Sequence, residues 1–90
     1  MRRVAVVARG ELVLPGVPIL KILASEARRV GVSGVAYIRD GVLYAVFEGP
    51  DEAVEQIVHF IPVASPAVKI RELEVREEEY RGEFSGFVTS

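Results

Sequence analysis

The sequence contains no cysteine, no asparagine, one histidine, one methionine and one glutamine. The lack of cysteine excludes disulfides, thiolate chemistry and cysteine-bound metals. A single histidine excludes a histidine-rich metal site, so we expect no cofactor. A formal net charge of −2 provides no general attraction to nucleic acid or to an anionic membrane, and we expect neither as a partner. Because side chains that degrade on heating are scarce and arginine outnumbers lysine nine to two, the composition indicates a thermophilic source.

Long hydrophobic runs are also missing. The run Val4–Ala8 ends at Arg9, which is too early for a signal peptide. The run Leu12–Leu20 contains Pro15, Gly16 and Pro18, and it is too short to cross a bilayer. We therefore expect a cytoplasmic protein. Ninety residues, half of them hydrophobic, are expected to form one domain over residues 1–90 around one core.

Hydrophobic periodicity divides the chain into seven elements. Strands are predicted over Val4–Ala8, Gly34–Ile38, Val42–Glu48, Ala67–Glu77 and, as a short last strand, Phe84–Val88. Apolar stripes at helical spacing predict one helix over Ile19–Val30, ended by Gly31, and a second helix that begins at Pro50 and Asp51 and continues to Ile61. Asp40 and Gly41 provide the positive φ angles of a tight hairpin turn.

The strand Ala67–Glu77 contains a change of phase. Val68 and Ile70 alternate in one register, and Leu73 and Val75 in the other. One extra residue near Arg71 and Glu72, a β-bulge, would bring all four apolar side chains to the same face.

The order strand, helix, strand, strand, helix, strand is that of the ferredoxin-like βαββαβ sandwich, an α+β fold. We expect an antiparallel sheet with both helices on one face and right-handed crossovers. The first and third strands are the most apolar, so they are expected to be central.

Short motifs along the chain resemble the acylphosphatase family in order and spacing. They are Arg9-Gly10, the stretch Gly31 to Gly34, the Asp40-Gly41 turn, Phe47 to Pro50, Glu52 to Val54, Ser65-Pro66 followed by Ile70, Leu73 and Val75, and the ending Gly82 to Phe87. The resemblance covers nearly the whole chain. It implies hydrolysis of acyl phosphates, in which a loop after the first strand holds the phosphate with backbone N–H groups and a final arginine. An asparagine at the end of the second strand orients the attacking water.

Both side chains that the resemblance assigns to catalysis are replaced. The loop, which reads roughly V-Q-G-V-x-F-R in the family, aligns with Leu14 to Leu20, so leucine stands at the arginine position. The asparagine position falls at Ile38, or at Tyr37 with another gap. Leucine has no side-chain N–H groups, so it cannot bind phosphate through two hydrogen bonds as an arginine guanidinium does. We therefore expect a domain without ordinary acyl phosphate hydrolysis, which acts as a binding or homo-oligomeric interaction module.

Two other functions stay open. The protein could be an active acylphosphatase with a remodelled phosphate loop, in which Arg9 and Lys21 and the amides of Gly16, Val17 and Ile19 hold phosphate or an acyl phosphate. It could also be a regulatory domain that binds a small molecule. The region from Gly31 to Val54 also resembles blue-light-sensing flavin domains, but Ala45 stands where those domains carry a glutamine.

The face of the sheet away from the helices is expected to be apolar. Alternation places six apolar side chains there, Val7, Val35, Tyr37, Val42, Tyr44 and Val46, together with Ala5. Charged side chains are expected around them, namely Arg3, Arg9, Glu48, Glu74 and Arg76. An apolar patch with a polar rim is typical of an interface, and it predicts a homodimer or a contact with a partner through this open face.

Overall fold

The computed structural model describes residues 1–11, 18–66 and 68–90. The elements in this part of the chain are β1 (Arg2–Glu11), α1 (Ile19–Val30), β2 (Ser33–Arg39), β3 (Val42–Gly49), α2 (Asp51–Phe60), a 3-10 turn η1 (Ile61–Val63), β4 (Lys69–Glu78) and β5 (Phe87–Thr89). Each predicted strand and helix is present, with ends that differ by a few residues.

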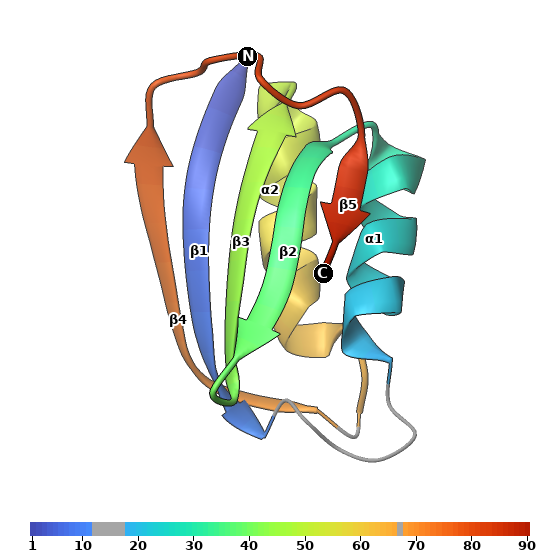
Figure 1. The fold of residues 1–90 in the computed structure, drawn as a ribbon, viewed down its shortest axis with the longest axis vertical. Coiled ribbons are helices and arrows are strands. Elements are labelled where there is room, and N and C mark those ends of the chain that lie inside the picture. The colour runs from blue at the N-terminus through green and yellow to red at the C-terminus, as the bar shows by residue number, and fades with distance from the viewer. Residues whose placement is uncertain (12–17, 67) are drawn as a thin grey trace.

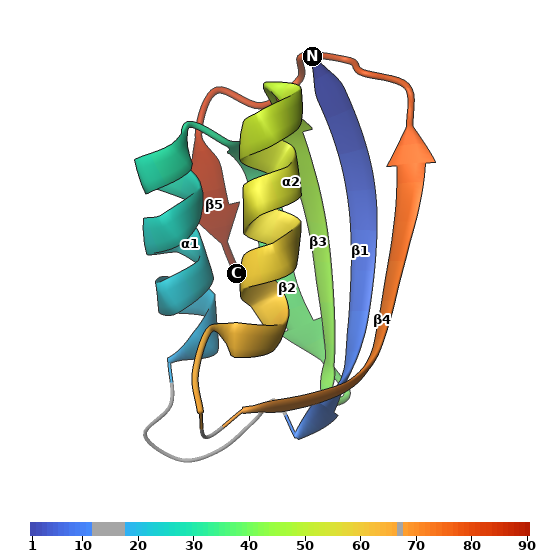
Figure 2. The same cartoon turned by 180° about the vertical axis from the view of Figure 1, so that it is seen from behind.

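The described strands form one sheet in the order β4-β1-β3-β2-β5, with β1 and β3 central among the four long strands, as expected. Both helices cover the same face, and no helix of the described residues lies on the opposite face (Figures 1 and 2). The α+β ferredoxin-like prediction is confirmed, with one correction. The sheet is mixed, because β5 pairs in parallel with β2. The connection from β4 passes over the end of the sheet and returns the chain along β2.

Local sequence signals explain where several elements begin and end. Asp40 and Gly41 have φ angles of 52° and 74°, which is the turn that joins two strands tightly. Gly31 ends α1 in the left-handed conformation, and the N–H of Val32 donates to the carbonyl of Ala27 at 2.8 Å. At the start of α2, Asp51 and Glu52 face the positive end of the helix dipole.

The core lies between the helices and one face of the sheet. From β1 it takes Val4, Val6 and Ala8, which alternate with residues that face away from the helices. The other buried apolar residues of the sheet and of α1 and α2 are Ile19, Leu23, Ala24, Ala27, Ala36, Leu43, Ala45, Phe47, Ala53, Val54, Ile57 and Phe87. The ring of Phe47 stacks on that of Phe87 with centroids 5.5 Å apart, which fixes β5 to the core.

Strand β4 contains the predicted bulge. Glu72 pairs with Arg9 and Ile70 pairs with Gly10, so Arg71 has no partner across the ladder. Because of this extra residue, Ile70, Leu73 and Val75 all lie opposite residues of β1 on the helix-facing side.

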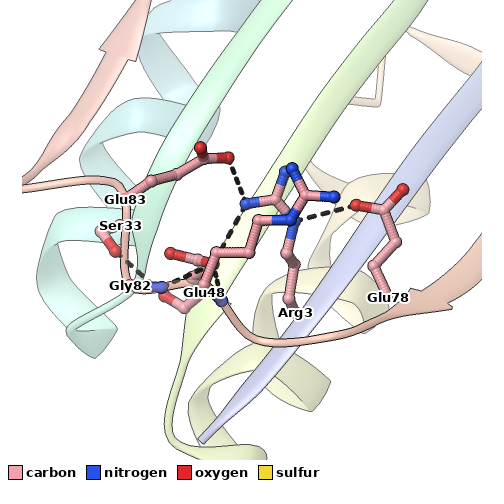
Figure 3. A network of polar contacts seen from close by, with 7 residues as sticks. Arg3, Ser33, Glu48, Glu78, Gly82 and Glu83 are labelled. Carbon is pink, nitrogen blue, oxygen red and sulfur yellow. Dashed lines mark hydrogen bonds and ion pairs between the residues drawn. The ribbon is translucent and has the colours of Figure 1, made fainter.

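One end of the open face is covered by the chain itself. The segment 79–86 crosses over Arg3 and Glu48, whose exposed fractions are 7% and 1%. Glu48 accepts hydrogen bonds from Arg3 (3.1 Å) and from the backbone N–H of Gly82 (3.2 Å), as Figure 3 shows. It also accepts one from the backbone N–H of Arg81 (3.0 Å). Arg3 also pairs with Glu78 and Glu83. The expectation that Arg3 and Glu48 lie on an exposed rim is therefore wrong, because alternation along a strand cannot show what a later segment covers.

No helix in the described ranges has the length and apolar content needed to cross a membrane. The cytoplasmic location stays a prediction.

Candidate functional site

The candidate site is the end of the molecule where β1 finishes and α1 begins. α1 starts at Ile19, and the N–H of Ile22 donates to the carbonyl of Pro18 at 3.0 Å. The N–H groups of a first helical turn have no partner within the helix, and the helix dipole adds positive potential there. The first turn of α1 carries no acidic residue. This end of α1 is therefore suited to a bound anion such as phosphate.

Of the five residues proposed for anion binding, the structure places three. Gly16 and Val17 lie outside the described residues. Ile19 is buried in the core, so only its backbone can serve a ligand. Lys21 is exposed in the first turn of α1, and it forms no ion pair with any residue that the structure describes.

Arg9 lies on a different face from Lys21. Its neighbour Ala8 points into the core, so Arg9 points to the open face of the sheet. Its Nη1 lies 3.5 Å from a carboxylate oxygen of Glu74 and 3.7 Å from one of Glu72. The structure thus does not bring Arg9 beside Lys21, and the guanidinium of Arg9 already pairs with two carboxylates.

The two positions assigned by resemblance to catalytic side chains hold packed apolar groups. Leu20 and Ile38 are half-buried and both pack against the core. Ile38 lies opposite Leu43 on the helix-facing side of the sheet, which is the side of α1. Tyr37, the other candidate for the asparagine position, points to the open face and stacks on Tyr44 with ring centroids 5.3 Å apart. Ile38 is therefore the position that shares a side of the sheet with α1.

Comparison with known proteins identifies the family. The acylphosphatase family model matches residues 15–89. The chain belongs to the acylphosphatase family. It is 41% identical to an acylphosphatase of Aeropyrum pernix in an alignment of 87 positions that covers 94% of this chain and 84% of that protein. It is 37% identical to an acylphosphatase of Pyrobaculum calidifontis over 94% of this chain and 77% of that protein.

The fold agrees with a solved acylphosphatase. The crystal structure of acylphosphatase from Bacillus subtilis superposes with a TM-score of 0.90, at 23% identity, over 100% of this chain and 99% of that one. At this identity the likeness shows that the two proteins share the fold.

These comparisons overturn the functional expectation drawn from the sequence. The prediction of a binding or interaction module without ordinary acyl phosphate hydrolysis is wrong, because curated acylphosphatases match the chain at 36–41% identity along nearly its whole length. That prediction gave most weight to the loss of the two catalytic side chains. Backbone N–H groups and a helix dipole also hold phosphate, and the replacement at Leu20 does not remove them.

The described residues offer little for a metal. No three histidine or carboxylate side chains among them are grouped so that they could hold a metal ion. The absence of a cofactor stays a prediction.

Proposed function

We propose that this protein is an active acylphosphatase, which converts an acyl phosphate and water into a carboxylate and inorganic phosphate. The observation that supports this proposal most strongly is the match to curated acylphosphatases over 94% of the chain. In this reaction the oxygen of water attacks phosphorus, and the bond between phosphorus and the bridging oxygen breaks. The carboxylate leaves with the bonding electrons, and the proton of the water passes to solvent.

The phosphoryl group would lie at the N-terminus of α1. Its charge spreads over three oxygens in the transition state, and catalysis consists mainly of positioning and charge stabilisation. The N–H groups of the first turn and the helix dipole would supply part of this stabilisation. We assign Lys21 as the nearby cation, because it is exposed in the same turn and no acidic residue accompanies it there. Lysine provides a point charge in place of an arginine fork, so we expect weaker phosphate binding.

The first experiment measures hydrolysis of benzoyl phosphate and acetyl phosphate by the purified protein. We expect release of phosphate above the spontaneous rate. The change Lys21→Ala should lower kcat/KM roughly tenfold or more, since a hydrogen bond to a charged group contributes about 1.5–3 kcal/mol. The control Arg29→Ala removes a cation from the other end of the same helix and should leave the rate unchanged. A rate equal to the blank from folded protein would contradict the proposal.

A second measurement locates the phosphate. Titration with inorganic phosphate, followed by amide NMR, should shift the signals of Gly16, Val17 and Ile19 in a saturable way. Installing the family residues with Leu20→Arg and Ile38→Asn should tighten this binding and raise kcat. If the three amides do not respond to phosphate, the anion site at the start of α1 is wrong.

A further inference from the structure

The open face of the sheet carries a continuous apolar surface. We define the apolar face as Ala5, Val7, Val35, Tyr37, Val42, Tyr44, Val46 and Val88. These residues lie in cross-strand rows, with Val35, Val46 and Ala5 in one row and Tyr37, Tyr44 and Val7 in the next. Val88 extends the first row onto β5, where 58% of its surface is exposed. The segment 79–86 covers the end at Arg3 and Glu48, but no helix crosses the rows themselves (Figure 1).

We propose that this apolar face binds a second copy of the chain and forms a two-fold symmetric dimer. The charges at its two edges are complementary to each other. On β4, Glu72 and Glu74 point to the open face, and both are more than half exposed. On β2, Arg39 points to the same face and has no ion pair within the described ranges. In the row of Arg39 the β4 edge is therefore acidic and the β2 edge basic, as an interface that pairs with itself requires. Two cations also face this side near β4, because Arg9 pairs with both glutamates and Arg76 lies opposite Ala5.

The register specifies a symmetry axis that uses this complementarity. A two-fold axis parallel to the strands, between β1 and β3, places β2 of one copy over β4 of the other. It also places the segment 79–86 of one copy opposite that of the other, so the two sheets would contact each other through the uncovered rows. Arg39 and Glu72 stand in the same row, so each Arg39 would face Glu72 of the second copy. In the neighbouring row the hydroxyl of Tyr37 would face the Glu74 carboxylate. An axis directly over β3 would place Arg39 against Arg9, which is a repulsive pair.

The same axis also matches large side chains to small ones. β1 presents Ala5 and Val7 to the open face, whereas β3 and β2 present Tyr44 and Tyr37. With the axis between β1 and β3, Tyr44 of one copy lies over Val7 of the other. Ala5 and Val7 help to line a hollow of about 220 Å³ in the apolar face. This hollow is where the second copy's Tyr44 would enter.

The available area suits a dimer. The molecule measures 34 Å by 22 Å along its two longest axes, so roughly 750 Å² is the upper limit of what a sheet face can offer to a partner. Stable protein interfaces bury about 800 Å² from each partner. The apolar face covers part of this area, so we expect a dimer that forms reversibly rather than one that is permanent.

The test is the molecular mass measured by sedimentation and light scattering from micromolar to millimolar concentration. We expect a concentration-dependent rise to the mass of a dimer. Tyr44→Lys places a charge in the centre of the apolar face and should keep the protein monomeric. The control Val63→Lys alters an apolar residue that is 73% exposed in η1, away from this face, and should dimerise normally. Circular dichroism confirms that both variants are folded.

A charge exchange tests the arrangement independently of folding. Arg39→Glu should weaken the dimer roughly tenfold or more. The double variant Arg39→Glu with Glu72→Arg restores the opposite charges and should recover most of the affinity. A chain that stays monomeric at millimolar concentration overturns the proposal, as does a dimer that Tyr44→Lys leaves intact. A dimer that the double variant fails to restore overturns the strand-parallel arrangement.

Discussion

Glu48 is the residue whose charge depends most on the tertiary structure. Its Oε2 accepts three hydrogen bonds, and its Oε1 has no partner among the described residues. Burial by itself raises the pKa of the Glu48 carboxyl, but hydrogen bonds from the backbone of Arg81, the Arg3 guanidinium and the backbone of Gly82 outweigh it. The pKa of Glu48 is therefore lowered. The ionised side chain holds the segment 79–86 against the sheet.

This predicts a stability loss in acid. A carboxyl whose pKa is lower in the folded state stabilises the fold fully above its unfolded pKa, near 4.5, and loses this effect as the pH falls through the folded value. We expect the free energy of unfolding to fall below about pH 4.5. Glu48→Gln should reduce this pH dependence without abolishing it, because the pKa values of Glu26, Glu55 and Glu78 are also lowered.

At neutral pH, Glu48→Gln should lower the free energy of unfolding by about 3 kcal/mol, the low end of the range for breaking a buried ion pair. The low end applies because Arg3 would still form its ion pairs with Glu78 and Glu83. Urea denaturation at several pH values measures both effects. The control Glu79→Gln changes an exposed carboxylate in the same segment, and an equal loss there would contradict the assignment to Glu48.

At the scale of elements, the bulge in β4 decides which side chains reach the core. Arg71 is the extra residue, and it pairs with Glu11 at 2.8 Å on the surface. Without it, Ile70 and Leu73 would be two residues apart, which is the spacing of a regular strand with both on one face. If Arg71 were removed, Ile70 and Glu72 could therefore be joined directly without changing the register of either half of β4.

This leads to a prediction about deletions. Deleting Arg71 should leave the free energy of unfolding within about 1 kcal/mol, since both halves of β4 keep their register. Deleting Glu74 should cost about 2 kcal/mol or more, because a one-residue slip turns apolar side chains such as the half-buried Leu73 to the other face. Chemical denaturation of the two variants provides the comparison. Equal losses would show that the bulge does not set the register.

At the scale of the whole molecule, arginine ion pairs connect elements that are far apart in sequence. Arg2 on β1 pairs with Glu77 on β4 and with Glu55 on α2. Arg3 connects β1, β3 and the segment that follows β4. Networks of this kind gain importance on heating, because the cost of removing charges from water falls with temperature.

We therefore expect a melting temperature above about 65 °C, the upper end of the mesophilic range. Arg2→Leu should lower it by several degrees, because the change removes the ion pairs to Glu77 and Glu55. Circular dichroism during heating measures both values, with Lys69→Ala as a control for an exposed cation on β4. Melting within the mesophilic range would contradict the thermophilic source indicated by the composition.

Local chemistry made much of the fold predictable. The turn at Asp40-Gly41 and the helix end at Gly31 depend on the backbone conformations of those residues alone. The bulge at Arg71 is visible in the sequence as a change in the alternation of β4. The candidate site was harder to predict. Leu20 and Ile38 could be found by alignment, but every residue other than proline carries a backbone N–H that can bind phosphate. The two replaced side chains therefore gave a wrong expectation about activity.

The sequence by itself determined the order of the elements, the central strands and the alternation that separates the core from the open face, because these follow from periodicity and turn chemistry within short stretches. Only the tertiary structure decided that Arg3 and Glu48 are buried, that Arg9 pairs with Glu72 and Glu74, and that β5 runs parallel to β2. Burial and pairing depend on which distant segment packs over a residue, and that is a property of the folded chain as a whole.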